Sequence, residues 1–121
     1  MKYDDNNIFA KILRGEIPCN KIYEDDYVLS FYDVNPQKKI HALIIPKGKY
    51  IDLDDFNSNA SNDEIVGLMK GITTVSKKLG ISSIDGKGYR ALANISDYGG
   101  QEVPHLHFHL FGGEKVGKMV S

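Results

Sequence analysis

Three of the four histidines in this chain lie within five residues, at every second position of a short apolar run. The run reads HLHFHLF and contains His105, His107 and His109. Imidazole suits catalysis and metal binding near neutral pH, because its ordinary pKa of about 6.5 lets the neutral ring act as a nucleophile or ligand and the protonated ring act as an acid. So dense a cluster from so small a total indicates a chemical site rather than background composition.

The spacing of the three histidines fits a β-strand. Successive side chains of a strand alternate between its faces, so the histidines share one face while Leu106, Phe108 and Leu110 share the other. Same-face neighbours lie about 6.7 Å apart, close enough for their rings to converge on one small ligand, whereas on a helix they would splay apart. A half-solvated strand with incidental histidines is the plain alternative, but Lys, Thr or Glu would serve that purpose equally well.

Two chemistries remain for such a strand, and the sequence favours one of them. A catalytic zinc site uses three histidine nitrogens and a water, with each nitrogen about 2.0–2.1 Å from the metal. Three same-face strand positions span about 13 Å, which makes ligation by all three difficult. Nucleophilic attack on phosphorus needs no metal, because one imidazole can attack while its neighbours set its tautomer and protonate the leaving group. Glycine pairs at 99–100 and 112–113 could bring backbone amides to a phosphate.

The elements that must position this run can be read along the chain. A short helix is expected over residues 8–13, where apolar residues recur at helical spacing after capping Asp and Asn residues and before Gly15. Two β-rich runs, 21–24 and 28–34, suggest a hairpin, and a third run extends over 40–46. Their close spacing leaves no room for helical crossovers and favours an antiparallel α+β sheet.

The second half of the chain predicts one long helix. Ser61 and Glu64 form the pattern of a capping box, and apolar residues then recur on one helical face as far as Gly80, a natural stop. Gly67 and Gly71 lie four residues apart inside this helix, where glycine is disfavoured by about 1 kcal/mol relative to alanine. Their presence suggests the close approach of another backbone.

The remaining segments connect these elements. Residues 50–62 are rich in Asp, Asn and Ser and are expected to form a loop, while residues 89–95 form a fourth β-rich run. A glycine-containing loop over 96–101 then leads to the histidines. Pro104 directly precedes His105 and has no N–H to donate, so we expect it to loosen the entry to that strand.

Length and composition limit the classes of function. A chain of 121 residues fits one domain, over 1–121, with a hydrophobic core of its own. Fifteen Lys and Arg against 16 Asp and Glu argue against binding to nucleic acid or to an anionic membrane, and favour a small-molecule partner. The single cysteine, Cys19, cannot form an intramolecular disulfide. With no signal peptide and no apolar run of about 20 residues, we expect a soluble intracellular, cytoplasmic protein, with nuclear residence left open.

The residues around the histidine run carry a family resemblance. GGQEVPHLHFHLFGG resembles the histidine triad signature, His-x-His-x-His followed by two apolar residues, and its flanking Gly-Gly-Gln and Gly-Gly are similar to the Hint branch of that family. NIFAKILRGEIP, IYEDDYVLSFYDVNPQKKIHALIIPK and YRALANISDYGG are similar to other segments of the same branch, so the resemblance covers most of the chain. On these motifs the chain is identified as a member of the histidine triad (HIT) family.

The resemblance implies a fold, an assembly and an activity. Hint proteins have an α+β fold, with an antiparallel sheet of about five strands, one long helix and one short helix, and form homodimers with the sheet continued or packed across the interface. They bind purine nucleoside monophosphates such as AMP and hydrolyse the P–N bond of nucleoside phosphoramidates through a covalent nucleotidyl-histidine, with no cofactor and no metal. Hydrolysis of dinucleoside polyphosphates, a nucleotide-binding scaffold without turnover, and a zinc protein remain as alternatives.

Matching the chain to the family by position also implies roles for single residues. The middle histidine, His107, would be the nucleophile, and His109 would assist proton transfer on the leaving-group side. His105 and His41 would complete the hydrogen-bonded set around the phosphate. Further residues fall at nucleotide-binding positions: Asn94 and Gln101 at the phosphate, Asp33 at the ribose hydroxyls, and Ile8, Phe9, Ile12, Phe31 and Val34 as apolar walls around the base.

Overall fold

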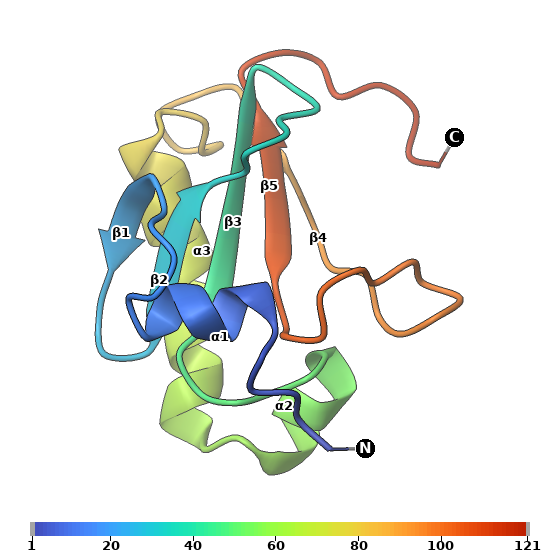
Figure 1. The fold of residues 1–121 in the computed structure, drawn as a ribbon. Helices are drawn as coiled ribbons and strands as arrows, with labels where there is room; N and C mark the ends of the chain where they lie inside the picture. The colour runs from blue at the N-terminus through green and yellow to red at the C-terminus, as the bar shows by residue number, and fades with distance from the viewer. Residues whose placement is uncertain (1, 121) are drawn as a thin grey trace.

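The computed structural model describes residues 2–120 and shows an antiparallel sheet covered by helices (Figure 1). The elements have these bounds: α1 Ile8–Leu13, β1 Lys21–Glu24, β2 Val28–Tyr32, β3 Ile40–Pro46, α2 Leu53–Asn59, α3 Asn62–Lys78, β4 Arg90–Leu92 and β5 Phe108–Gly112. The five strands run in the order β1-β2-β3-β5-β4, and every neighbouring pair is antiparallel. The expected α+β fold is confirmed. Within residues 2–120, no helix has the length and apolar character needed to span a membrane.

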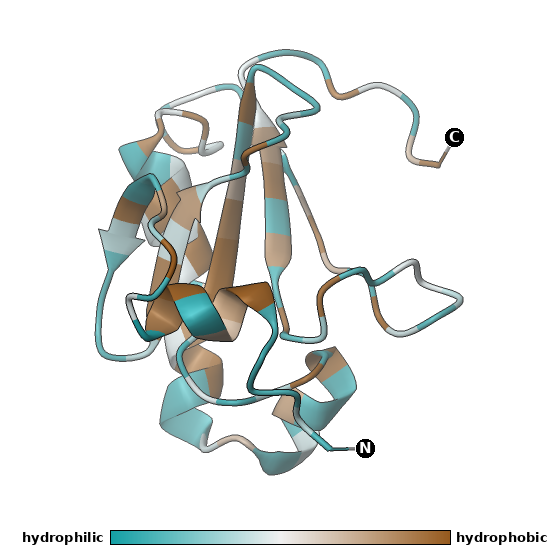
Figure 2. Ribbon diagram, in the orientation of Figure 1, coloured by the Kyte–Doolittle hydropathy of each residue, from teal (hydrophilic) through white to brown (hydrophobic). Residues whose placement is uncertain are grey.

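Both faces of the sheet are packed, and its central strand contributes to both. Ala42 and Ile44 of β3 pack in a cluster with α3, whereas Leu43 and Ile45 pack in a second cluster with Phe9 of α1. β3 is therefore hydrophobic almost throughout, while β5 alternates between hydrophobic and hydrophilic residues (Figure 2). Burial on both faces explains why the sequence of β3 reads as a continuous apolar run.

The leucines of the histidine run face α3. Leu106 and Leu110 are fully buried in the α3 cluster, so the alternation expected for a strand holds across this segment. Pro104 lies in a bend, and regular pairing begins only at Phe108. The expectation of one strand that carries all three neighbouring histidines is therefore met only by His109, while His105 and His107 precede β5.

Helix α3 begins as predicted. The Oγ of Ser61 accepts from the N–H of Glu64 at 3.1 Å, and the Glu64 carboxylate accepts from the N–H of Ser61 at 3.0 Å, which completes the capping box. A Cβ on Gly67 would lie 2.7 Å from the ring of Tyr27, and Gly71 faces side chains of β2 and β3. Gly67 therefore admits a side chain of the turn between β1 and β2, and Gly71 admits side chains of the sheet, not the second backbone that their spacing suggested.

The expectation of a loop over residues 50–62 is wrong for its central part, which forms α2. The Asp52 carboxylate accepts from the N–H of Asp55 at 2.8 Å and caps this helix. Phe56 is 1% exposed and packs its ring edge-on against Tyr50. One cap and one buried aromatic side chain stabilise a short helix that the polar composition of the segment conceals.

Candidate active site

Four histidines lie in a row on the sheet face that carries α1. His109 lies on β5 and His41 on the neighbouring strand β3, with the Nε2 of His41 2.9 Å from the Nδ1 of His109. The ring centroids of His107 and His109 are 5.1 Å apart. His105 lies at the far end, with its ring fully buried. The structure thus brings together histidines from two separate parts of the sequence.

A backbone carbonyl fixes the tautomer of His107. The Nδ1 of His107 lies 2.8 Å from the carbonyl oxygen of His105, and because a carbonyl can only accept, Nδ1 carries the proton. Burial lowers the pKa of His107, and the bond to His105 and the charges of Asp33 and Glu102 only partly oppose this shift. The ring is therefore neutral near pH 7, and its unprotonated Nε2 is a nucleophile.

The tautomer of His109 is the opposite one. The Nδ1 of His41 accepts from the backbone N–H of Gln37 at 3.1 Å, so the proton of a neutral His41 lies on Nε2. This Nε2–H is directed at the Nδ1 of His109, at 2.9 Å, and at the Oδ2 of Asp33, at 3.4 Å. Because the Nδ1 of His109 accepts, His109 carries its own proton on Nε2 and can donate it.

Burial keeps the other histidines of the row neutral as well. Burial lowers the pKa of His109 to about 4, with a further contribution from the neighbouring His107 and His41. The pKa of His41 is lowered by burial against the opposing charge of Asp33. Burial also lowers the pKa of His105 to about 4, despite its hydrogen bond to a backbone carbonyl. All four histidines are therefore neutral near pH 7, and the hydrogen-bond partner of each ring decides which nitrogen carries its proton.

The two reactive nitrogens remain accessible. Within residues 2–120, no buried side-chain nitrogen or oxygen lacks a hydrogen-bond partner. The Nε2 atoms of His107 and His109 have no partner in that part of the chain, so neither is sealed in the interior. His109 also lines a hollow of about 380 Å³, together with Asn94, Lys38 and Arg90. A small molecule can therefore approach the row from the side of His109.

Two of the polar residues assigned to the nucleotide lie beside the row. Asp33 follows β2, where its Oδ1 accepts from the N–H of Asn35 while its Oδ2 stays close to His41. Asn94 follows β4 and shares the hollow with His109. Both positions suit contact with a ligand held at the histidines.

Gln101 is engaged differently. Its side-chain amide nitrogen donates to the carbonyl oxygens of Ile51, at 2.6 Å, and Val103, at 3.0 Å. Its amide oxygen accepts from the N–H of Ser96 at 2.9 Å. Gln101 therefore ties together the loop that precedes the histidines, and its contact with a phosphate stays a prediction.

The five apolar residues expected around the base fall into two groups. Phe9 and Phe31 are buried with centroids 5.6 Å apart, and Ile12 packs against the same cluster. Phe9 also meets the ring of the middle histidine edge-on, at a centroid distance of 5.0 Å. Ile8 and Val34, by contrast, are 46% and 91% exposed. The structure thus gives a packed wall beside the row and two apolar side chains free at the surface.

The same residues can be tested as metal ligands. Donor atoms of Asp33, His41 and His109 all lie within 4.8 Å of one another, which resembles a three-ligand metal site. A metal-ligating histidine usually donates its other ring N–H to an acceptor. The other ring nitrogen of His41 instead accepts from the N–H of Gln37, which places the proton on the nitrogen that a metal would need. This donor set is a poor fit for a divalent metal.

Two partners of the row were not predicted. The hydroxyl of Tyr3 lies 2.6 Å from the Nδ1 of His105, and the backbone N–H of Gln37 bonds to His41. Tyr3 and His105 are 102 positions apart, and no local pattern signals such a contact. Gln37 makes its contact through the backbone N–H, so the residue type at this position does not indicate a contact with His41.

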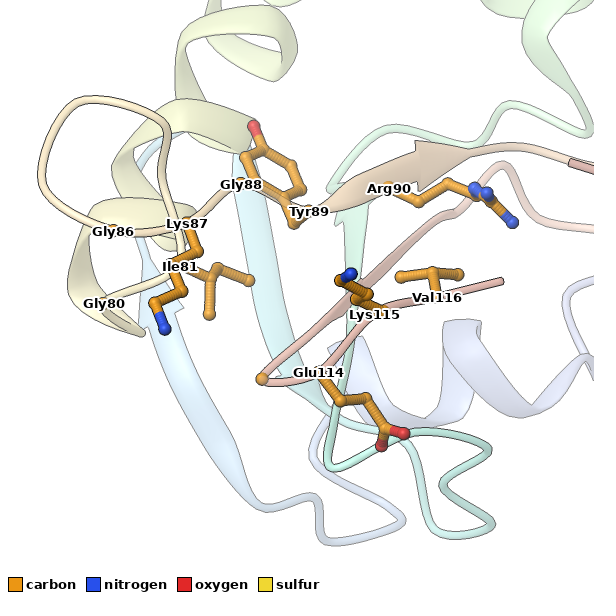
Figure 3. A pocket seen from close by; sticks show the side chains of 11 residues that line it. Gly80, Ile81, Gly86, Lys87, Gly88, Tyr89, Arg90, Glu114, Lys115 and Val116 are labelled. Atoms are coloured by element: carbon orange, nitrogen blue, oxygen red, sulfur yellow. The ribbon is translucent and has the colours of Figure 1, made fainter. Parts of the chain in front are cut away.

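A hollow larger than the one beside His109 lies elsewhere. It has a volume of about 760 Å³ and is lined by residues 80–81, 86–90 and 113–116, among them Lys87, Arg90 and Lys115 (Figure 3). No histidine lines it. The convergence of the histidines, rather than the size of a hollow, identifies the candidate site.

Comparisons with known proteins identify the family to which this chain belongs. The family model described as HIT domain matches residues 14–116, a range that includes all four histidines. A HIT-like protein of 13.2 kDa from Azospirillum brasilense, named as uncharacterized, is 48% identical over 119 residues, which cover 98% of this chain and 95% of the relative. Purine nucleoside phosphoramidase from Escherichia coli K12 is 39% identical over 117 residues, covering 97% of this chain and 95% of the relative.

Solved structures share the fold along almost the whole chain. A histidine triad protein from Clostridium difficile aligns with a TM-score of 0.84 at 39% identity and covers 98% of each chain. A HIT family hydrolase from Clostridium thermocellum aligns with a TM-score of 0.85 at 36% identity, covering 98% of this chain and 99% of the other. Because 98% of this chain is covered in both cases, the similarity extends well beyond the five strands of the sheet.

Proposed function

This chain belongs to the HIT domain family, and we propose that it hydrolyses the P–N bond of purine nucleoside phosphoramidates through a covalent nucleotidyl intermediate on His107. One observation carries the proposal. His107 and His109, two residues apart, hold their protons on opposite ring nitrogens, Nδ1 and Nε2. A nucleophilic nitrogen and an N–H hydrogen-bond donor therefore lie side by side. The name of the Escherichia coli relative supports the substrate class.

In the first step, the Nε2 of His107 attacks phosphorus and the P–N bond to the leaving group breaks. The departing nitrogen takes a proton from solvent and leaves as a neutral amine, while the Nε2–H of His109 donates a hydrogen bond to it. The carbonyl of His105 holds the Nδ1–H of the His107 ring, which becomes positively charged when its Nε2 binds phosphorus. The Nε2–H of His41 keeps the His109 ring in the tautomer that donates. Backbone and histidine groups already in place thus stabilise the new charge on His107 and orient a donor at the leaving group.

In the second step, water displaces His107 from phosphorus. The oxygen of the water binds phosphorus, one of its protons passes to solvent and replaces the proton used in the first step, and the bond between phosphorus and the His107 nitrogen breaks. A nucleoside monophosphate leaves, and both histidines have their starting tautomers. The cycle consumes one water and needs no redox partner.

The nucleotide would lie along the row. The Asp33 carboxylate, beside His41, can accept from both hydroxyls of a ribose, because a carboxylate offers two acceptor oxygens. This places the ribose next to the phosphate-binding histidines. The exposed apolar side chains of Ile8 and Val34 are free to cover a purine base, with Phe9 behind them. AMP is therefore the expected product and ligand.

The edge of the sheet supports a homodimer. Within residues 2–120, β4 pairs only with β5, so its other edge is open. An open strand edge readily pairs with another strand, and a second copy of β4 would continue the sheet across a twofold axis. Light scattering of the purified chain should give twice the mass of one protomer.

Turnover by metal-free protein tests the proposal. Wild type and His107→Ala, both treated with chelator, would be compared on an adenosine phosphoramidate and, in parallel, on a dinucleoside polyphosphate. The proposal expects fast phosphoramidate cleavage by wild type alone. Preferential cleavage of the polyphosphate would favour the related hydrolase activity, and AMP binding without cleavage of either substrate would favour a nucleotide-binding scaffold.

A further inference from the structure

Tyr3 reaches the histidine row from the N-terminal arm, residues 2–7, which lies outside the segment matched by the HIT domain model. Its hydroxyl is 2.6 Å from the Nδ1 of His105. The two rings also meet edge-on, with centroids 5.7 Å apart and planes at 73°. The contact therefore adds to the row a residue that the family match does not include.

The direction of this hydrogen bond follows from the other contact of His105. The Nε2 of His105 lies 2.8 Å from the carbonyl oxygen of Pro46, which can only accept, so Nε2 carries the proton. In the neutral ring Nδ1 is then an acceptor, and the Tyr3 hydroxyl donates to it. Because His105 is fully buried, loss of the hydroxyl would leave an acceptor without a partner in the interior.

His105 links Tyr3 to His107 through its own backbone. The His105 ring is held from both sides, by Tyr3 and by Pro46, and the carbonyl of the same residue accepts the Nδ1–H of His107 at 2.8 Å. Strand pairing has not yet begun at this position, since β5 starts at Phe108. The Leu106 N–H, in the same peptide unit as the His105 carbonyl, donates to the carbonyl of Tyr50 at 2.9 Å, so the two bonds to the His105 ring act together with one backbone bond to fix this part of the chain.

The N-terminal arm is itself held in place. The Asp5 carboxylate forms an ion pair with Lys49 at 2.8 Å, and the Asp5 carbonyl accepts from the Arg14 guanidinium at 2.8 Å. The side chain of Asn7 donates to the carbonyl of Asp4 at 2.7 Å. These contacts on both sides of the arm keep Tyr3 against His105.

We infer that Tyr3 is a positioning residue, whose hydroxyl fixes the ring of His105 and, through the His105 carbonyl, the tautomer and aim of His107. The kinetic consequence rests on the proposed function, because it requires His107 to be the nucleophile. The hydrogen-bond arrangement itself requires no substrate. The inference can therefore be tested by kinetics and, independently, by spectroscopy of the free protein.

The kinetic test uses Tyr3→Phe, which removes the hydroxyl and keeps the ring. We expect kcat to fall by about 10-fold, similar to the loss when an outer hydrogen bond to a functional histidine is removed, with KM almost unchanged. Tyr23→Phe is the matched control, because it also removes a hydroxyl bonded at 2.8 Å to a side chain, Asp25, but at the β1 edge of the sheet. The control should keep the wild-type kcat.

The spectroscopic test uses nitrogen-15 NMR of the histidine rings. Wild type should show His105 protonated on Nε2 and His107 protonated on Nδ1. In Tyr3→Phe, the Nδ1 signal of His105 should move toward that of a nitrogen without a hydrogen bond, and His107 should show a mixture of tautomers. Tyr23→Phe should match wild type. A role of Tyr3 in folding alone would not change the tautomer of His107.

The outcomes separate this inference from the proposed function. If wild type hydrolyses phosphoramidates but Tyr3→Phe keeps both kcat and the wild-type ring signals, the positioning role is wrong and the proposed function stands. If wild type does not hydrolyse them, the proposed function fails, and the ring signals still decide whether Tyr3 fixes His105. Unchanged signals in Tyr3→Phe overturn the inference in either case.

Discussion

His107 and His109 have identical side chains, lie two residues apart and share one face of the sheet, yet their hydrogen-bond partners place their protons on opposite ring nitrogens. His107 faces a carbonyl and holds its proton on Nδ1, whereas His109 faces His41 and holds its proton on Nε2. In each case the partner of the ring decides which nitrogen carries the proton. For His109 that partner is His41, whose own tautomer is fixed by the N–H of Gln37. The role of each histidine is thus set by backbone donors and acceptors, not by residue type.

The two ends of the row also differ in their surroundings. The end at His105 and His107 is closed by the rings of Tyr3 and Phe9. The end at His109 opens into a hollow. A closed end suits a nucleophile that must keep one orientation, and an open end suits leaving groups of different shapes. The predictions below test this division.

Removal of the nucleophile should have the largest effect. His107→Ala is expected to lower kcat by at least about 1,000-fold for every phosphoramidate, because the chemical step itself is removed. Binding of AMP should persist, since the ribose and base contacts remain. Steady-state kinetics and calorimetric titration with AMP would measure the two effects. Retention of most of the activity would remove His107 from the nucleophile position.

Removal of the proposed leaving-group donor should have a smaller effect that depends on the leaving group. His109→Ala is expected to lower kcat by about 100-fold for an alkylamine leaving group, because the nitrogen that must gain a proton loses its hydrogen-bond donor. An arylamine with a more acidic nitrogen should lose much less. Kinetics on a series of amines would measure this dependence. An equal loss for all amines would contradict the separation of nucleophile and leaving-group donor.

Burial of His105 at the closed end of the row should make the stability of the folded protein depend on pH. The folded pKa of His105 is lowered to about 4, against about 6.5 in the unfolded chain, so the unfolded state binds more protons between these values. Stability is therefore complete above about pH 7 and falls as the pH drops toward 4, with a loss of about 2 kcal/mol at pH 5 from this residue alone. Urea unfolding at pH 7.5 and pH 5 would measure the difference.

His105→Gln provides the matched variant for that prediction. Glutamine can still donate to the Pro46 carbonyl and accept from Tyr3, but it does not titrate in this range. The variant should therefore lose less stability between pH 7.5 and pH 5 than wild type does. An identical loss in both proteins would exclude His105 as its source.

The smallest expected effect concerns the proposed contact between the Asp33 carboxylate and the ribose of the nucleotide. Asp33→Ala should weaken AMP binding by about 10-fold, because hydrogen bonds from the ribose hydroxyls to a charged acceptor are lost. A dideoxy analogue of AMP should bind wild type and Asp33→Ala with the same affinity, since it lacks those hydroxyls. Calorimetry with both ligands would separate a ribose contact from a general change in the pocket.

Much of the scaffold follows from local sequence rules. The capping box of Ser61 and Glu64 starts α3, and alternation places Leu106 and Leu110 in the core with the histidines on the other face. These features depend on residues close together in the chain, and such patterns are visible in one sequence.

The proton arrangement could not be predicted in this way. It depends on the carbonyl of Pro46, the N–H of Gln37 and the hydroxyl of Tyr3, each brought to the histidines by the tertiary fold. Backbone groups are the same in every residue, so the sequence does not mark which of them a ring will meet. Helix α2 was missed because a single buried aromatic side chain, Phe56, stabilises it.

Trapping the covalent intermediate tests the central claim most directly. Wild type would be mixed with an adenosine phosphoramidate and quenched within the first turnover under alkaline denaturing conditions, and the modified peptide would be mapped by mass spectrometry. The tautomer assignment predicts an adenylyl group on His107, formed as the amine is released and absent from His107→Ala. An adenylyl group on His105 or His109, or turnover without any modified histidine, would contradict it.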